Sequence, residues 1–101
     1  QEIENLLITH PAVADVAVIG APHEEMGEQV LAIIRPADLS RDHAELSAEI
    51  DAFARDHLSH VKTPRRYDFR DELPRAETGK LYKRLLRNEY WEKDQADQAE
   101  G

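Results

Sequence analysis

DVAVIGAP (residues 15–22) and VLAIIRP (residues 30–36) decide the fold of this chain. Each contains an unbroken apolar run, which is typical of a buried strand. Gly20-Ala21-Pro22 is expected to break the first strand, and Arg35-Pro36 is expected to close the second. The segment between the two runs, residues 23–29, is predicted to be a polar loop. Two strands joined by a short loop are most simply an antiparallel pair.

Helices are predicted before and after this pair of strands. Apolar side chains within residues 3–7 share one helical face, and His10-Pro11 ends that helix. From Leu46 to His57, apolar residues recur at helical spacing, with acidic residues mostly on the other faces. Either Ser40 or Asp42 can cap this second helix through a side-chain oxygen.

A third strand and a last helix complete the order of elements. Tyr67 and Phe69 alternate with charged residues, which suits a short half-buried strand, and the leucines of residues 81–86 mark a helix with a basic side. The acidic segment 92–101 lacks large apolar residues and is predicted to be a disordered tail. The order helix, strand, strand, helix, strand, helix predicts an α+β domain over residues 1–91. Its small three-stranded sheet is at least partly antiparallel and is covered by helices.

The composition excludes several classes of protein. At 101 residues the chain makes one small domain with a modest core, and no apolar stretch is long enough to span a membrane. It has no cysteine, hence no disulfide and no thiolate metal site, which fits the cytoplasm. Its five histidines lack metal-ligand spacing, and we expect no bound metal. Because Gln1 is not methionine, we expect the natural chain to begin upstream.

Charge is distributed unevenly along the chain. The net charge of −8 argues against general nucleic-acid binding. Residues 62–87, however, hold 9 Lys/Arg against 4 Asp/Glu, whereas residues 1–61 hold 3 against 12 and residues 88–101 hold 1 against 5. A basic segment framed by acidic ones indicates a local anionic partner, such as a phosphorylated ligand, or simply a solvated charged surface.

The most distinctive part of the basic segment is LPRAETGK, residues 73–80. Pro74 ends the preceding extended stretch, and Gly79 can adopt backbone angles that other residues avoid. The loop through Thr78 and Gly79 thus presents Lys80 at the mouth of the last helix. A lysine in that position is a mobile positive charge suited to a phosphate or carboxylate oxygen.

Four segments together resemble the C-terminal lid domain of adenylate-forming enzymes, and of acyl-CoA synthetases in particular. They are QEIENLL at 1–7, HPAVADVAVIG at 10–20, KTPR at 62–65 and LPRAETGK at 73–80, in the family's order and at family-like spacing. In this resemblance residues 1–91 form the lid, and the last of the four segments is the loop that carries the catalytic lysine.

The resemblance implies a reaction in two steps. A carboxylic acid attacks the α-phosphate of ATP to give acyl-adenylate and pyrophosphate, and the CoA thiol then displaces AMP. Lys80 matches the lysine that reaches the carboxylate and α-phosphate oxygens in the first of two lid poses. ATP with its Mg²⁺ and the acyl group would lie on an N-terminal domain, and this chain would begin after the hinge. We therefore expect a fragment of a ligase, inactive alone, with fatty acid metabolism as its context.

The resemblance also implies further contacts. Lys62, Arg65 and Arg66 match a region near the CoA nucleotide in several relatives, where they would meet its phosphates. Met26 stands where many relatives have a tryptophan, so it is interpreted as a gap-filling residue rather than a contact of the pantetheine arm. The matching lysine of relatives is a target of acetylation, which would make Lys80 a substrate of a lysine acetyltransferase and a deacetylase.

Two alternatives stay open. Lids of peptide-synthetase adenylation domains and of luciferases carry the same lysine loop and serve a different acceptor. LYKRLLR at 81–87, followed by Tyr90-Trp91, resembles bacterial CoA ligases more closely. The alternative of another class is a free-standing module that binds a nucleic acid or an acidic protein through the basic segment.

Overall fold

The computed structural model describes residues 2–25 and 27–100, with side chains as far as Asp94. Its elements follow the predicted order, so the predicted α+β class with three strands is confirmed. Along the chain they are α1 (Glu2–Leu7), β1 (Val13–His23), β2 (Gly27–Pro36), α2 (His43–His57), β3 (Arg66–Phe69) and α3 (Lys83–Glu100).

The three strands form one mixed sheet in the order β1-β2-β3. β1 and β2 are antiparallel, with Val16 opposite Ile34, and their register shifts between Val13 and Asp15. The predicted antiparallel pair is thus confirmed. β3 runs parallel to β2, because α2 carries the chain back to the same end of the sheet before β3 begins.

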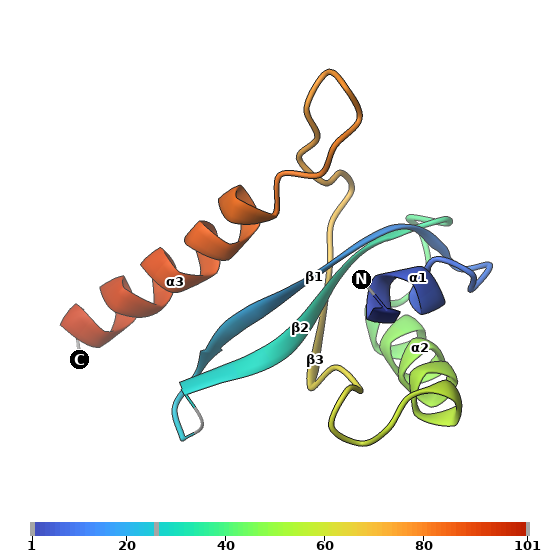
Figure 1. Ribbon diagram of the computed structural model, residues 1–101, viewed down its shortest axis with the longest axis horizontal. Coiled ribbons are helices and arrows are strands. Elements are labelled where there is room, and N and C mark those ends of the chain that lie inside the picture. The colour runs from blue at the N-terminus through green and yellow to red at the C-terminus, as the bar shows by residue number, and fades with distance from the viewer. Residues whose placement is uncertain (1, 26, 101) are drawn as a thin grey trace.

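The sheet is buried on both faces, with α1 and α2 on one side and α3 on the other (Figure 1). Successive residues of β2 therefore point into different cores, which explains its unbroken apolar run. The core on the first side consists of Leu7, Val13, Val16, Ala32, Ile34, Leu46, Ile50 and Ala54. The core beneath α3 consists of Ala17, Ile19, Ala21, Leu31, Ile33, Leu73 and Leu86.

β1 is longer than the sequence predicts. It does not break at Gly20-Ala21-Pro22 but continues to His23, because β1 is an edge strand and proline is tolerated where one side of a strand has no partner. The carbonyl of Gly20 accepts a hydrogen bond of 2.9 Å from the indole N–H of Trp91 in α3. The connection to β2 is accordingly shorter than predicted, since β2 begins at Gly27.

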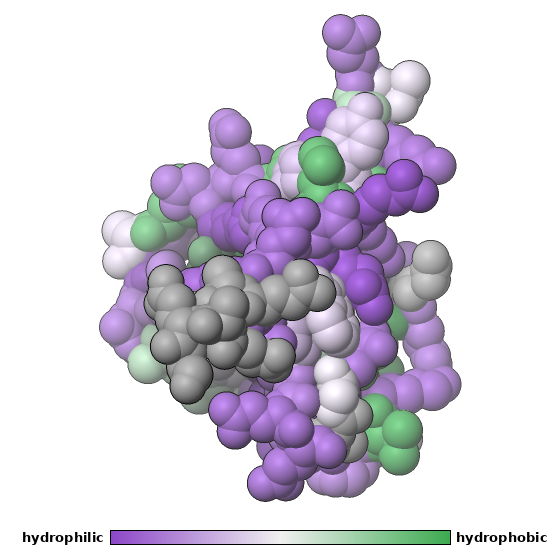
Figure 2. Space-filling view, turned by 90° about the vertical axis from the view of Figure 1, so that its left-hand side faces the viewer, coloured by the Kyte–Doolittle hydropathy of each residue, from purple (hydrophilic) through white to green (hydrophobic). Residues whose placement is uncertain are grey.

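The two long helices differ in how they begin. Asp42 caps α2 by accepting a hydrogen bond of 3.0 Å from the backbone N–H of Glu45, which confirms one of the two predicted caps. α3 begins at Lys83 rather than at Leu81, and its backbone is helical to Glu100, through the segment predicted to be disordered. The side chains of residues 95–100 lie outside the described part, and disorder of this tail stays a prediction. The coloured part of the face seen in Figure 2 is mostly hydrophilic.

Candidate functional site

Lys80 follows the turn of a short hairpin that projects from the body of the domain (Figure 1). Two backbone hydrogen bonds of 2.8 Å close the turn, one from Gly79 N–H to the Ala76 carbonyl and one from Ala76 N–H to the Lys80 carbonyl. Gly79 has a φ of +88°. This left-handed conformation suits glycine and is typical of a hairpin turn that ends in a bulge.

The base of the hairpin is held by backbone pairing. Arg75 and Leu81 form an antiparallel bridge, and the Tyr82 N–H donates to the Pro74 carbonyl at 2.9 Å. This pairing explains why α3 does not start at Leu81, whose backbone belongs to the hairpin. Pro74 thus lies at the base of the hairpin, and Thr78 is exposed in its turn.

An open cleft of about 530 Å³ lies beside the hairpin. Four of its lining residues are basic, and Val16 and Leu81 add apolar surface. Its lining residues are Glu4, Val16, Arg75, Lys80, Leu81, Tyr82, Lys83 and Arg84.

Two of the four basic residues in the cleft are neutralised. Lys83 Nζ lies 2.6 Å from a carboxylate oxygen of Glu4, and Arg75 is paired with Asp15, whose hydrogen bonds raise the pKa of the Arg75 guanidinium. Lys80 and Arg84 are exposed, and within the described side chains neither has an acidic partner. The cleft therefore offers two unpaired positive charges to an anionic ligand.

The three basic residues predicted to meet CoA phosphates have different partners. Lys62 Nζ lies 2.5 Å from a carboxylate oxygen of Glu2, and Arg65 Nη2 lies 3.3 Å from the imidazole of His60. Arg66 starts β3 and bonds the carboxylate of Asp68 through two contacts of 3.1 Å. The three side chains thus share no partner.

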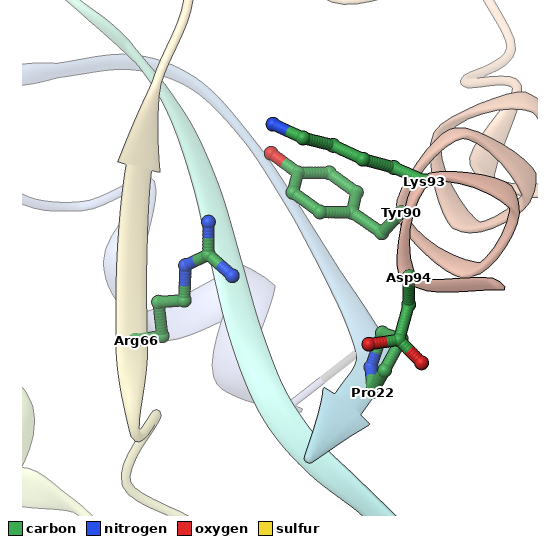
Figure 3. A pocket seen from close by; sticks show the side chains of 5 residues that line it. All are labelled: Pro22, Arg66, Tyr90, Lys93 and Asp94. Carbon is green, nitrogen blue, oxygen red and sulfur yellow. The ribbon is translucent and has the colours of Figure 1, made fainter. Parts of the chain in front are cut away.

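Arg66 instead belongs to a pocket between β3 and α3 (Figure 3). Its guanidinium lies 5.5 Å from the centre of the Tyr90 ring, and the hydroxyl of Tyr90 donates to Asp68 at 2.5 Å. Burial raises the pKa of Tyr90, and the hydrogen bond to Asp68 raises it further. Pro22, Lys93 and Asp94 complete the wall of this pocket, whose volume is about 240 Å³.

Sequence reasoning missed Tyr90 and Lys93 as neighbours of Arg66. Their spacing of three residues places both on one face of α3, which a helical projection shows. That this face lies over Arg66 depends on how α3 crosses the sheet, and no local signal predicts that crossing.

The lysine hairpin and the start of β3 lie at opposite ends of the domain (Figure 1). In both Figure 1 and Figure 2 the hairpin projects at the top, while the connection from α2 to β3 lies at the bottom of Figure 1. Met26 lies outside the described residues, so its predicted gap-filling role stays a prediction. Across residues 2–25 and 27–100 no helix is long and apolar enough to cross a membrane. The described side chains also form no group of three or more metal-ligating residues.

Residues 2–80 match the AMP-binding enzyme C-terminal domain. The chain belongs to this family. The match covers α1, the sheet, α2 and the hairpin as far as Lys80, where it ends.

Relatives of this C-terminal domain are ligases of much greater length. The chain is 36% identical over 86 residues to the acetyl-coenzyme A synthetase of Desulfatibacillum aliphaticivorans, covering 85% of this chain and 13% of that protein. It is 39% identical over 90 residues to the fatty acid–[acyl-carrier-protein] ligase ScoC of Streptomyces coeruleorubidus, covering 89% of this chain and 17% of that protein. A crystal structure of Brucella canis acyl-CoA synthetase matches with a TM-score of 0.85 and 35% identity, covering 92% of this chain and 17% of that one.

Proposed function

We propose that this C-terminal domain is the mobile lid of an AMP-forming acyl-CoA synthetase and supplies the cation for the adenylation step. The observation that carries the proposal is Lys80, held after a hydrogen-bonded turn, unpaired among the described residues, at the edge of a basic cleft. The lengths of the relatives support a partner domain, because the chain covers only 13% to 17% of them.

In this proposal Lys80 meets the substrate where charge develops. When a carboxylate attacks the α-phosphate of ATP, negative charge builds on the phosphate oxygens, and a positioned ammonium stabilises it. Arg84 lines the same cleft and is the second unpaired cation there within the described part of the chain. It is suited to the other phosphate oxygens, including those of the departing pyrophosphate.

The rest of the ATP site is proposed to lie on an N-terminal domain, which would bind ATP with its Mg²⁺ and the acyl group. Two exposed apolar side chains support docking beside the cleft, since Tyr82 is 48% and Leu85 is 50% exposed. Contiguous exposed apolar patches are typical of a surface that another protein covers.

For the second step we propose that the opposite end of the domain contacts CoA. Lys62, Arg65 and Arg66 are exposed basic residues at that end. Arg65 has no acidic partner within the described side chains, and Lys62 is paired with Glu2, which is exposed, whereas Asp68 beside Arg66 is partly buried. Exposed ion pairs are weak, so a phosphate can replace Glu2 beside Lys62 at little cost.

The proposal is tested by Lys80→Ala in the full-length enzyme. We expect adenylation, measured as carboxylate-dependent pyrophosphate release, to fall by about 100- to 1,000-fold, because one preorganised charge is lost from the transition state. Thioester formation from supplied acyl-adenylate should be largely unchanged. Arg55→Ala removes an exposed cation of α2 and is the matched control. Equal damage to both half-reactions would contradict the role of Lys80.

The acceptor has a second candidate, because one relative is named a fatty acid–[acyl-carrier-protein] ligase. An acyl carrier protein presents its thiol on a protein surface, whereas CoA presents it beside a phosphorylated nucleotide. Supplying the enzyme with CoA or with a pantetheinylated carrier protein, and measuring thioester formation, decides between them. A further alternative, the lid of a peptide-synthetase or luciferase type, predicts no thioester with CoA.

A further inference from the structure

Arg75 connects the lysine hairpin to β1 across 60 residues of sequence. Its Nε donates to Asp15 Oδ2 at 2.9 Å, and its Nη2 donates to Asp15 Oδ1 at 2.5 Å. Its third donor, Nη1, reaches the carbonyl of Gly79 at 2.6 Å. We propose that Asp15 and Arg75 are positioning residues that fix the direction in which Lys80 leaves the hairpin, an inference that rests on the proposed function.

Asp15 is a rigid anchor for this contact. It lies at the register shift of β1, and its side chain is only 17% exposed. Its Oδ1 also accepts a hydrogen bond of 2.9 Å from the Val16 N–H. The carboxylate is therefore also held to the edge strand of the sheet independently of Arg75.

The hairpin needs such an anchor because little else holds its turn. A two-stranded hairpin is marginally stable on its own, and here the pairing consists of three backbone hydrogen bonds, two of which make the bridge between Arg75 and Leu81. Glu4 fixes the start of α3 through Lys83, but that contact acts beyond Lys80. Arg75 thus provides the side-chain contact that reaches the turn itself.

The carbonyl of Gly79 is the atom through which Arg75 acts on Lys80. That carbonyl and the backbone nitrogen of Lys80 belong to one planar peptide group. A hydrogen bond to the Gly79 oxygen therefore restrains the orientation of this peptide plane, and with it the position of the Lys80 Cα. Gly79 lacks a Cβ, so its own structure restricts its backbone rotation very little. The hydrogen bond from Arg75 supplies the restriction that glycine lacks.

An exposed ion pair with no other role contributes little to stability. This pair differs in geometry, because a guanidinium that bonds a carboxylate through two nitrogens fixes orientation as well as distance. A stabilising role and a positioning role make different predictions once the two half-reactions are measured separately.

The test uses Asp15→Asn and Arg75→Lys in the full-length enzyme, each also combined with Lys80→Ala. Asn keeps the shape of Asp15, and Lys keeps the charge of Arg75 while losing the two-pronged contact. We expect each single variant to slow adenylation by about 10- to 100-fold, the cost of a small misplacement of a catalytic group. Thioester formation from acyl-adenylate should be unchanged. Arg41→Lys, which loosens a similar two-pronged contact with Glu49 beside α2, is the matched control.

The combined variants separate positioning from stability. If Asp15 and Arg75 act through Lys80, neither substitution slows adenylation further once Lys80 is alanine. Losses that multiply in the combined variants, or that affect both half-reactions equally, would overturn the inference. So would an unchanged adenylation rate in the single variants while Lys80→Ala is damaged. If Lys80→Ala itself leaves adenylation intact, the proposed function fails instead.

Amide hydrogen exchange at Ala76 and Gly79 should be faster in both single variants and unchanged in Arg41→Lys, even if a variant is less stable.

Discussion

At the scale of single residues, ion pairing sorts the basic residues of the segment 62–87 into two groups. Six of its nine Lys/Arg have a carboxylate partner. Arg65, Lys80 and Arg84 have none within the described side chains. Arg65 contacts His60 at one end of the domain, whereas the other two share the cleft beside the hairpin. The segment is therefore in large part a solvated, paired surface, with unpaired cations at the two places where anionic ligands are proposed.

The exposure of Lys80 leads to a prediction about its modification. Acetylation removes the ammonium charge, so acetylation at Lys80 in the full-length enzyme should reduce adenylation to the level of Lys80→Ala, and deacetylation should restore it. Mass spectrometry of the modified enzyme, paired with pyrophosphate-release rates, measures both quantities. Lys80→Arg keeps the charge and cannot be acetylated, and its adenylation rate should not respond to the acetyltransferase. Full acetylation of Lys80 at the unmodified rate would contradict both this regulation and the catalytic assignment.

At the scale of elements, β3 is the shortest strand and depends on side-chain contacts to α2. Tyr67 points to the α2 side of the sheet, and its hydroxyl donates to a carboxylate oxygen of Asp51 at 3.1 Å. Burial raises the pKa of Tyr67, and the charge of Asp51 raises it further. Tyr67 therefore connects a four-residue strand to a fifteen-residue helix.

Tyr67→Phe should lower the free energy of unfolding by about 1 kcal/mol at neutral pH, the typical contribution of one hydrogen bond. The raised pKa means that the folded state holds the phenol proton more tightly than the unfolded state. This contribution is complete below the ordinary tyrosine pKa of about 10 and is lost as the pH rises above it. The free energy of unfolding, measured by urea unfolding at several pH values above about 10, should fall with pH more steeply for wild type than for Tyr67→Phe. The difference should be about 1.4 kcal/mol per pH unit. Equal slopes would be evidence against the burial of the phenol. Tyr82→Phe, at an exposed position, is the control for loss of a hydroxyl at neutral pH.

Predictability from sequence follows the range of the interaction. The order of elements and the Asp42 cap depend on apolar periodicity and on neighbouring residues, and both are confirmed. The true extent of β1 was missed because the position of Pro22 at a sheet edge is a property of the assembled sheet. Lys80 was found through a contiguous motif, although its chemical role stays a proposal. Asp15 could not be found in this way, because its contact with Arg75 spans 60 residues.

At the scale of the whole molecule, one sheet separates two cores, and each depends on β2. Because Ala32 and Ile34 pack on one side and Leu31 and Ile33 on the other, neither core can form without the same strand. The two layers should therefore unfold together rather than one after the other.

The isolated 101-residue chain should consequently fold on its own and unfold in a single cooperative transition, with a stability of about 5–15 kcal/mol. It should release no pyrophosphate from ATP with any carboxylic acid. The open cleft supplies cations, but the N-terminal domain that is proposed to hold the substrates is absent from the isolated chain. Circular dichroism and near-ultraviolet absorbance or fluorescence, followed during heating, should give coincident transitions. Turnover by the purified chain would contradict the proposal that it is one part of a larger enzyme.

The opposite placement of the lysine hairpin and the start of β3 (Figure 1) has a consequence for timing. A compact body that sits over a single catalytic cavity can turn only one of its ends inward at any instant. When Lys80 is at the reacting atoms, residues 62–66 would be turned away from the cavity. When residues 62–66 face the cavity, Lys80 would be turned away. The sequence of chemical events would be set by geometry, so even saturating CoA could not intercept the ATP-dependent step before the domain had turned.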